Sequence, residues 1–407
     1  MTRRHGRAGG NGDLRRIFLA RGSRGLASGY FAVVLGVELH HQGLTGISVG
    51  LVLAAVLGGA ALALLGVRRF ADVAGRRRCY LAGYLAQSAA GVVLVLSPWW
   101  WVLVLVGLTG TLSSEIIDSG PFGALEQVML TTAVTEERRL RSFSRYGAVG
   151  TASSALGALG AGLLQLVGPG AIGPSSFLPI VPLALFGAAC AWGLSGRVEH
   201  LAIDVTSASP GPAPALAPAP ANAGQPARGE TRRIVHRLSA LFALDSFGAG
   251  FTVQAFVAYW LAARFDASTL SIGMIFLGIG VLQTLSMMVA GRLGERFGLL
   301  ATMVFTHLPS NGFLAAIAFA PNLPVAAVLL CLRASLSEMD VPTRNAYVMA
   351  LVPAQDRTQA ASTTGLARLL ARPLGPLLAG VAQTMGLGAP FLVSGVLKGI
   401  YDVSLWR

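Results

Sequence analysis

Long apolar runs separated by short charged interruptions constrain this chain more than any other feature of its sequence. Because a membrane-spanning helix needs roughly 20 mostly apolar residues, these runs predict about twelve spanning helices. They are residues 20–39, 45–66, 79–97, 100–130, 144–167, 175–195, 238–262, 269–290, 299–320, 323–351, 358–384 and 389–406. We therefore expect an all-helical integral membrane protein whose first apolar run is a retained helix and not a cleaved signal peptide.

The composition argues against a soluble globule. Only 12% of the residues are charged, whereas 54% are hydrophobic. The formal net charge of +13 would suit a nucleic-acid partner, but the basic residues lie in short interruptions between apolar runs and not on one domain face. This distribution fits the anionic cytoplasmic surface of a lipid bilayer, so we expect no nucleic-acid partner.

Arginines follow alternate predicted spans, which indicates how the chain is oriented. Arginine occurs in the connections at 1–16, 67–78, 135–142, 228–237, 291–298 and 354–362, and is absent from those at 97–101, 167–176, 320–324 and 386–390. Since cytoplasmic loops carry an excess of basic residues, the arginine-bearing connections and both termini are expected in the cytoplasm. The expected location is the cell (inner) membrane.

A Pro- and Ala-rich segment divides the chain into two similar halves. Residues 206–228 have no apolar periodicity, so we expect them to form a flexible cytoplasmic linker. The predicted division is an N-terminal six-helix half at 1–197, a linker at 198–237 and a C-terminal six-helix half at 238–407. In both halves, two spans, a charged turn, two spans, a second charged turn and two spans follow one another. Such an internal duplication is typical of transporters.

The first charged turn of each half carries a similar motif. Residues 70–78 read FADVAGRRR, and residues 291–298 read GRLGERFG. Both resemble the signature between the second and third helices of major facilitator superfamily transporters: glycine, an acid four residues later, arginine, any residue, glycine and then basic residues. The matching positions are Asp72, Gly75, Arg76, Arg77 and Arg78 in the first copy and Gly291, Glu295, Arg296 and Gly298 in the second. The first copy departs from the signature at Arg68 and Val73.

The resemblance implies two pseudo-symmetric six-helix halves and a function in secondary transport by alternating access. It also implies that Asp72 and Glu295 belong to a cytoplasmic gating motif that latches the halves in one conformation. The residues themselves allow a simpler interpretation, in which these charges only fix the sidedness of the turns. Gly75 and Gly298 suit either role, because glycine lets backbones approach closely in a tight turn.

Charged and polar side chains within the predicted spans are the candidates for a substrate or proton pathway, because such groups are costly in a bilayer unless they face a partner or water. They are Glu115, Asp118, Asp245, His307, Asn311, Arg333, Glu338, Asp340 and Arg344. The resemblance implies that spans four, seven and ten line a central cavity. Asp340 and Arg344 are four residues apart and can pair on one helix face. Asp340 is therefore expected either to carry protons or to form a structural pair.

The predicted function is secondary active transport of a small organic solute, with protons as the coupling ion. No GxxxxGK[ST] motif for direct use of ATP is present, and no His or Cys cluster has metal-ligand spacing, so we expect neither cofactor nor metal. The acidic groups in the spans suit a cationic or neutral solute, whereas Arg333 suits an anion. A monomer is one of the oligomeric states that the sequence allows.

The direction of transport is less constrained. Glycines in the fifth span favour efflux by resemblance to exporters of the superfamily, but small residues also let helices pack closely. Solute uptake by the same fold stays open as an alternative. A non-transporting membrane sensor and a membrane-embedded enzyme are further alternatives from other classes of protein.

Overall fold

The chain is helical throughout the part that the structure describes. The computed structural model describes residues 5–97, 99–114, 120–134, 136–164, 173–199, 228–353 and 356–407, and within these ranges it contains no strand. The predicted all-helical fold is confirmed. Glu115, Asp118, the side chain of Asp72 and residues 200–227 of the expected linker lie outside the described part.

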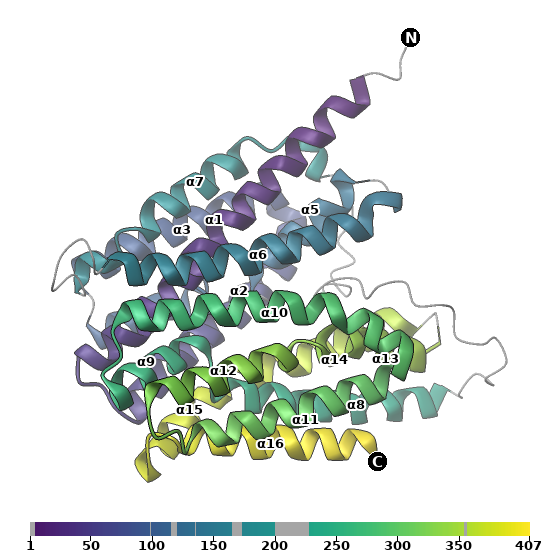
Figure 1. Ribbon diagram of the computed structural model, residues 1–407. Coiled ribbons are helices and arrows are strands. Elements are labelled where there is room, and N and C mark those ends of the chain that lie inside the picture. The colour runs from purple at the N-terminus through teal and green to yellow at the C-terminus, as the bar shows by residue number, and fades with distance from the viewer. Residues whose placement is uncertain are drawn as a thin grey trace. The chain divides into compact units, whose positions relative to one another are not determined.

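Most of the predicted spans correspond to one continuous helix each (Figure 1). These helices are α1 (His5–His41), α2 (Ile47–Ala74), α3 (Arg76–Leu96), α6 (Glu136–Leu164), α7 (Ile180–Trp192), α10 (Thr269–Phe297), α11 (Leu299–Ile317) and α16 (Ala389–Trp406). Two short 3-10 helices, η1 (Pro174–Phe177) and η2 (Gly196–Glu199), flank α7.

The predicted spans 100–130, 238–262, 323–351 and 358–384 are each formed by a pair of shorter helices. The pairs are α4 (Trp100–Leu108) with α5 (Pro121–Ala133), α8 (Arg228–Gly250) with α9 (Gln254–Phe265), α12 (Leu323–Ser337) with α13 (Asp340–Leu351), and α14 (Arg357–Ala371) with α15 (Leu374–Ala382), the last extended by η5 (Gln383–Met385). Backbone groups freed at such breaks cannot face lipid, because hydrocarbon offers them no hydrogen bonds. The interrupted spans therefore belong beside other protein segments or beside a water-filled cavity.

Length and composition alone mark seven helical segments of the described chain as able to cross a membrane. The predicted spans outside this set are either interrupted, as above, or carry charged residues, as α1 and α16 do. Fewer segments than the expected spans meet the length and composition criteria because the remaining spans are interrupted or contain charged residues. Breaks and buried charges, which reduce the apolar length of a helix, occur in the same segments that hold the polar side chains described below.

The two motif turns have nearly the same backbone geometry. Gly75 is the single residue between α2 and α3, with φ 92° and ψ 135°. Gly298 is the single residue between α10 and α11, with φ 89° and ψ 154°. Side chains rarely tolerate a positive φ in this region, so glycine is required at both positions for a steric reason.

The chain forms two compact units by its internal contacts. Unit 1 comprises Met1–Asp204 with Val253–Gly280, and unit 2 comprises Val205–Thr252 with Val281–Arg407. The division assigns α9 and the first part of α10 to unit 1, whereas α8 belongs to unit 2. Residues 228–237, which the sequence analysis assigned to the linker, form the first turns of α8.

Small residues bring α1 and α6 of unit 1 into close contact. An added Cβ at Gly29 would lie 1.8 Å from the carbonyl oxygen of Ser154, and one at Gly157 would lie 2.0 Å from that of Leu26. Neither clash can be relieved by moving a flexible side chain, since both involve backbone atoms. Gly157 of the fifth predicted span therefore has a packing role that needs no reference to the direction of transport.

Unit 1 also contains contacts between the two halves of the sequence. A Cβ at Gly36 of α1 would meet the carbonyl oxygen of Ala255 in α9 at 2.4 Å, and the Tyr259 hydroxyl donates to the carbonyl oxygen of Leu44 over 3.0 Å. A Cβ at Gly273 of α10 would lie 2.6 Å from the carbonyl oxygen of Ala158 in α6. These contacts lie near the arginine-free connection that follows α1, remote from the motif turns.

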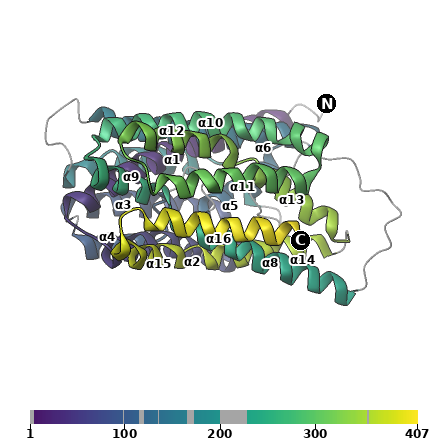
Figure 2. The same ribbon diagram turned by 60° about the horizontal axis from the view of Figure 1, so that its bottom comes forward.

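Unit 2 is built around α11. This helix packs along α16 and also contacts α12 and α13, while α8 packs against α14 and α16 (Figure 2). An apolar cluster that includes Phe242, Met303, Val348 and Tyr401 fills the space between these helices. The helices α8, α11, α13 and α16 consequently bring their polar side chains to a shared interior.

Candidate functional site

Each unit holds a cluster of ionisable side chains that is buried among its helices. The unit 2 cluster consists of Asp245, His307, Asn311, Asp340, Arg344, Lys398 and Asp402, each at most 5% exposed. The unit 1 cluster consists of Arg24, Tyr80, Tyr84, Glu126 and Tyr146, each at most 6% exposed. Buried charges are costly unless they are paired and hydrogen-bonded, and both clusters contain paired charges.

Asp245 of α8 is the centre of the unit 2 cluster. Its Oδ2 accepts a hydrogen bond from Nη1 of Arg344 over 2.9 Å, and its Oδ1 accepts one from Nζ of Lys398 over 2.5 Å. The same Arg344 nitrogen lies 3.2 Å from Oδ2 of Asp340. One carboxylate therefore joins α8 to both α13 and α16, and Arg344 is shared between two carboxylates.

His307 of α11 connects this centre to a second carboxylate. Its Nδ1 lies 2.8 Å from Oδ1 of Asp402, and its Nε2 lies 3.9 Å from Oδ1 of Asp245. Asn311, one turn later, donates to Oδ2 of Asp402 over 2.8 Å and so holds that carboxylate in place. The imidazole stands between two carboxylates, an arrangement that can pass a proton from one ring nitrogen to the other.

The remaining candidates of the tenth span contact other partners. Oε1 of Glu338, which lies between α12 and α13, accepts a hydrogen bond from the Gln283 side chain of α10 over 3.1 Å. The backbone carbonyl of Arg333 accepts a hydrogen bond from Ser310 of α11. Asp340 and Arg344 form the ion pair that their spacing allows, and Glu338 is hydrogen-bonded to the side-chain amide of Gln283.

The unit 1 cluster centres on Glu126 of α5, which is fully buried. Arg24 of α1 contacts both carboxylate oxygens, with Nη2 at 2.6 Å from Oε2 and Nε at 3.4 Å from Oε1. The Tyr80 hydroxyl donates to Oε1 over 2.5 Å, and the Tyr146 hydroxyl donates to Oε2. Glu126 is thus the acceptor for one guanidinium and two phenols from three different helices.

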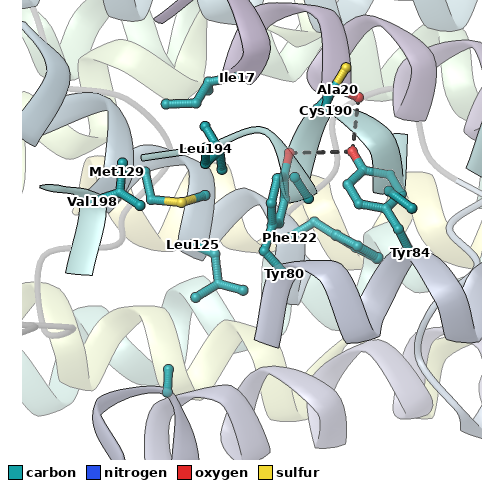
Figure 3. Packing of buried hydrophobic residues seen from close by; sticks show 13 residues of the cluster. Ile17, Ala20, Tyr80, Tyr84, Phe122, Leu125, Met129, Cys190, Leu194 and Val198 are labelled. Atoms are coloured by element: carbon teal, nitrogen blue, oxygen red, sulfur yellow. Dashed lines mark hydrogen bonds between the residues drawn. The ribbon is translucent and has the colours of Figure 1, made fainter. Parts of the chain in front are cut away.

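Aromatic packing surrounds this ion pair. Figure 3 shows the Tyr80 and Tyr84 hydroxyls pointing toward each other and the Tyr84 hydroxyl reaching the backbone of Ala20. The Phe122 ring lies beside both tyrosines, and the Arg24 guanidinium lies 5.5 Å from the centre of that ring. The apolar surroundings exclude water and strengthen the electrostatic contact between Arg24 and Glu126.

The two clusters occupy corresponding places in the predicted duplication with opposite charge. Arg24 lies in the first span and Glu126 in the fourth, whereas their counterparts in the second half are Asp245 in the seventh span and Arg344 in the tenth. In the first half the cation lies in the first span and the anion in the fourth, whereas in the second half the anion comes first and the cation lies in the fourth span of that half. Each half therefore ties its first and fourth spans together by a buried ion pair.

The gating motif residues lie at the ends of helices. Arg76, the first residue of α3, is 2% exposed, and Arg77 donates to the backbone carbonyl of Trp192 in α7. In the second copy, the side chains of Glu295 and Arg296 are exposed, and Glu295 has no ion-pair partner among the described residues. Arg77 of the first copy therefore ties α3 to α7 within unit 1.

Several site residues were not identified from the sequence: Arg24, Glu126, Lys398 and Asp402. Each stands within a predicted span, so the signal used for the other candidates was present. Lys398 and Asp402 are also four residues apart, which places them on one helix face. What the sequence did not supply was a reason to prefer Glu126 over the nearby acids of the same span.

Comparisons with known proteins give a fold and a distant relative. No family model matches the chain. An uncharacterized membrane protein of Saccharomyces cerevisiae is 25% identical over 416 residues, which cover 97% of this chain and 93% of the yeast protein.

Solved transporter structures are similar over almost the whole chain. The human organic anion transporter MFSD10 (TETRAN) is 17% identical, with a TM-score of 0.63 and coverage of 97% of this chain and 99% of that one. A D-xylose-proton symporter is 14% identical with a TM-score of 0.71, and the nucleoside transporter NupG is 14% identical with a TM-score of 0.67; for both, 97% of each chain is covered. At these identities the likeness shows the fold alone.

Proposed function

Because the chain has the fold of the major facilitator superfamily, that of a multi-pass membrane protein, we propose that it is a secondary transporter and not an enzyme. It moves a small organic solute across the cell membrane by alternating access, with both termini in the cytoplasm and with protons as the coupling ion. The observation that carries the proposal is the buried network of Asp245, His307, Arg344, Lys398 and Asp402, which joins the seventh, ninth, tenth and twelfth predicted spans.

The network offers a route for a proton. A proton taken up by Asp402 can pass to Nδ1 of His307, and the imidazole can then release its Nε2 proton toward Oδ1 of Asp245. Protonation of Asp245 weakens its ion pairs with Arg344 and Lys398, which come from different helices. Protonation is in this way linked to helix positions, as coupled transport requires.

This assignment changes the preferred proton carrier. Asp340 shares Arg344 with Asp245, which supports a structural role for Asp340. Asp402, by contrast, has neutral Asn311 and a titratable imidazole as its nearest polar partners. A carboxylate without an arginine can change its charge at a lower cost than one held by a guanidinium. We therefore assign proton uptake to Asp402 and His307.

Close packing in unit 1 and the motif turns lie at different ends of the helices. Gly36 packs on α9, and Gly273 of α10 packs on α6, at the end remote from the arginine-rich turns. The motif residues Asp72 and Glu295 act on the cytoplasmic side, where their removal shifts the balance between access states.

Transport in sealed proteoliposomes tests the proposal. Purified protein is reconstituted, a pH gradient is imposed, and a panel of neutral, cationic and anionic organic solutes is assayed for uptake and for solute-driven proton movement. We expect Asp402→Asn to abolish gradient-driven accumulation while solute exchange continues, because asparagine keeps the hydrogen bonds but not the charge. Movement of no solute in either direction would favour a membrane sensor or a membrane-embedded enzyme.

Asp340→Asn is the matched control, since it makes the same change on a carboxylate of the same unit. We expect this variant to keep proton coupling. Loss of coupling in a folded Asp340→Asn protein, with coupling intact in Asp402→Asn, would return the proton-carrying role to Asp340. The same vesicles report direction: efflux and uptake differ in whether solute moves against or with the imposed proton gradient.

A further inference from the structure

Arg21 of α1 is a buried cation without a counter-charge in the described part of unit 1. The residue is only 4% exposed. None of the described residues forms a hydrogen bond or an ion pair with its guanidinium, and its Nε is shielded from solvent. Arg24, one turn later on the same helix, is by contrast paired with Glu126. The unit 1 cluster and the adjacent Arg21 thus contain two guanidiniums and one described carboxylate.

Glu126 has no free position for a second cation. Each of its carboxylate oxygens already accepts from Arg24 and from one phenol, Tyr80 at Oε1 and Tyr146 at Oε2. Arg21 contacts the ring of Tyr146 instead, with its Cζ 5.0 Å from the ring centre. Such a cation–π contact stabilises the charge of a guanidinium but supplies no oxygen acceptor for its N–H groups. The N–H donors of Arg21 are therefore still available.

The backbone of α6 determines where this guanidinium lies. A Cβ added at Gly150 would be 2.0 Å from Nη2 of Arg21 and 2.4 Å from both Cζ and Nε. The guanidinium thus occupies the space that a side chain at position 150 would take. Tyr146 is one turn earlier, so both contacts come from one face of α6. Arg21 is consequently held against α6 by shape and by an aromatic ring, and not by a carboxylate.

The end of the Arg21 side chain is accessible although the rest of it is packed. Nε is shielded from solvent, whereas Nη1 and Nη2 are not shielded and form no hydrogen bond. A charged side chain within a membrane-spanning segment faces the protein interior or a water-filled space, because contact with lipid is unfavourable. A dissolved anion can therefore reach two nitrogens that have free donors.

We propose that Arg21 binds an oxyanion, the carboxylate or phosphate group of an organic solute that the protein transports. The two terminal nitrogens of a guanidinium can donate parallel hydrogen bonds to two oxygens of such a group, a geometry that a neutral or cationic solute cannot use. Bound oxyanion also offsets the cost of burying a cation without a counter-charge. The inference rests on the proposed transport function and specifies its substrate class.

Ligand-dependent thermal stability of the purified full-length protein in a neutral, lipid-free detergent tests the site without requiring transport. The probes are benzoate and phenyl phosphate, the neutral isostere benzamide, sulfate as an inorganic anion, and phosphatidylglycerol as an anionic lipid. We expect benzoate or phenyl phosphate to raise the melting temperature and benzamide to leave it unchanged. In Arg21→Gln, the affinity for the stabilising organic anion should fall by at least about tenfold, because a charged hydrogen-bond donor is lost.

Two glycines of α6 provide matched variants that keep every charge. In Gly150→Ala, the added methyl group displaces the guanidinium, so binding of the organic anion should weaken. Gly147→Ala makes the same change one turn earlier, where a Cβ would meet no atom within 4 Å, and should leave binding unchanged. Arg15→Gln removes a positive charge from an exposed position of α1 and should also leave binding unchanged.

Chemical labelling of the unchanged protein keeps the test decisive if Arg21→Gln folds poorly. Phenylglyoxal modifies accessible guanidinium groups, and mass spectrometry of the peptides identifies which arginine has reacted. We expect Arg21 to be modified and the stabilising organic anion to protect it. Arg24 should react more slowly, because its guanidinium is paired with Glu126.

Several results would overturn the proposal. They are no stabilisation by either organic anion, undiminished affinity in Gly150→Ala, and labelling of Arg21 that the organic anion does not prevent. Stabilisation by sulfate equal to that by the organic anions would reduce the site to one for inorganic anions. Stabilisation by phosphatidylglycerol alone would assign Arg21 to a lipid headgroup and not to a solute.

The outcomes separate this inference from the proposed function. If the vesicles transport another solute while neither organic anion binds, the transport proposal stands and the oxyanion site is wrong. If an organic anion binds in an Arg21-dependent manner but no solute crosses the membrane, Arg21 stands as a binding residue and the transport proposal fails.

Discussion

The ion pairs of unit 1 and unit 2 both neutralise buried charges between helices, but they differ in the number of partners that each charge has. In unit 1, a single carboxylate, Glu126, accepts from Arg24, Tyr80 and Tyr146. In unit 2, Arg344 has two carboxylates, while Asp245 has both Arg344 and Lys398. A cluster with one acceptor depends on that residue, whereas a cluster with shared partners can lose one contact and keep another.

The difference also indicates which unit is suited to change its state. All the donors to Glu126 converge on one buried point, so the unit 1 cluster has one favourable arrangement. The unit 2 cluster contains a titratable imidazole between two carboxylates and offers several arrangements of similar kind. We therefore propose that the first cluster contributes structural stability and that the second couples proton movement to solute movement.

The largest effect is expected when the unit 1 acceptor is removed. Glu126→Ala leaves one buried guanidinium and two hydroxyls without their acceptor, a loss that should destabilise the protein by about 3–5 kcal/mol. Asp340→Ala should cost less, because Arg344 keeps Asp245. The melting temperature and the monodisperse fraction in detergent compare the two variants. Equal losses would contradict the difference in redundancy.

Charge exchange should be tolerated in unit 1 and not in unit 2. With R24E combined with E126R, most of the stability lost in either single variant should return, because tyrosine hydroxyls can donate to or accept from the reversed pair. With D245R combined with R344D, little should return, since Lys398 would then face a second cation. Thermal melting of the two double variants and four single variants completes the comparison. If stability recovered equally in both units, Lys398 would not determine which helix carries the anion of the unit 2 ion pair.

A smaller effect is expected from the phenols. Tyr80→Phe removes a hydrogen bond to a buried carboxylate and should cost about 1.5–3 kcal/mol. Tyr84→Phe is the control in the same helix, because its hydroxyl donates to the neutral carbonyl of Ala20, a bond worth about 1 kcal/mol. Neither change should alter solute transport by more than its effect on folded protein. A loss of proton coupling in folded Tyr80→Phe would place coupling in unit 1 as well.

Features that depend on local spacing could be predicted from the sequence. The apolar runs predicted the helical fold, and the duplicated motifs located Gly75 and Gly298, whose positive φ values require glycine. The interval of four residues allowed the contact between Asp340 and Arg344, because helix geometry brings such positions together whatever surrounds them. Asp245, His307 and Asn311 were candidates because a polar group in a span is costly wherever it lies.

Only the tertiary structure decided which of these groups meet. The contact of Arg24 with Glu126, and those of Asp245 with Arg344 and Lys398, join helices that are far apart in the sequence. Such contacts depend on how each helix is rotated and shifted against its neighbours, which depends on packing along its whole length. One buried acid in a span looks much like another by composition, and the partner that neutralises it comes from a distant helix. The local sequence therefore determines that a charge in a span needs a partner, and the packing of the helices determines which partner it has.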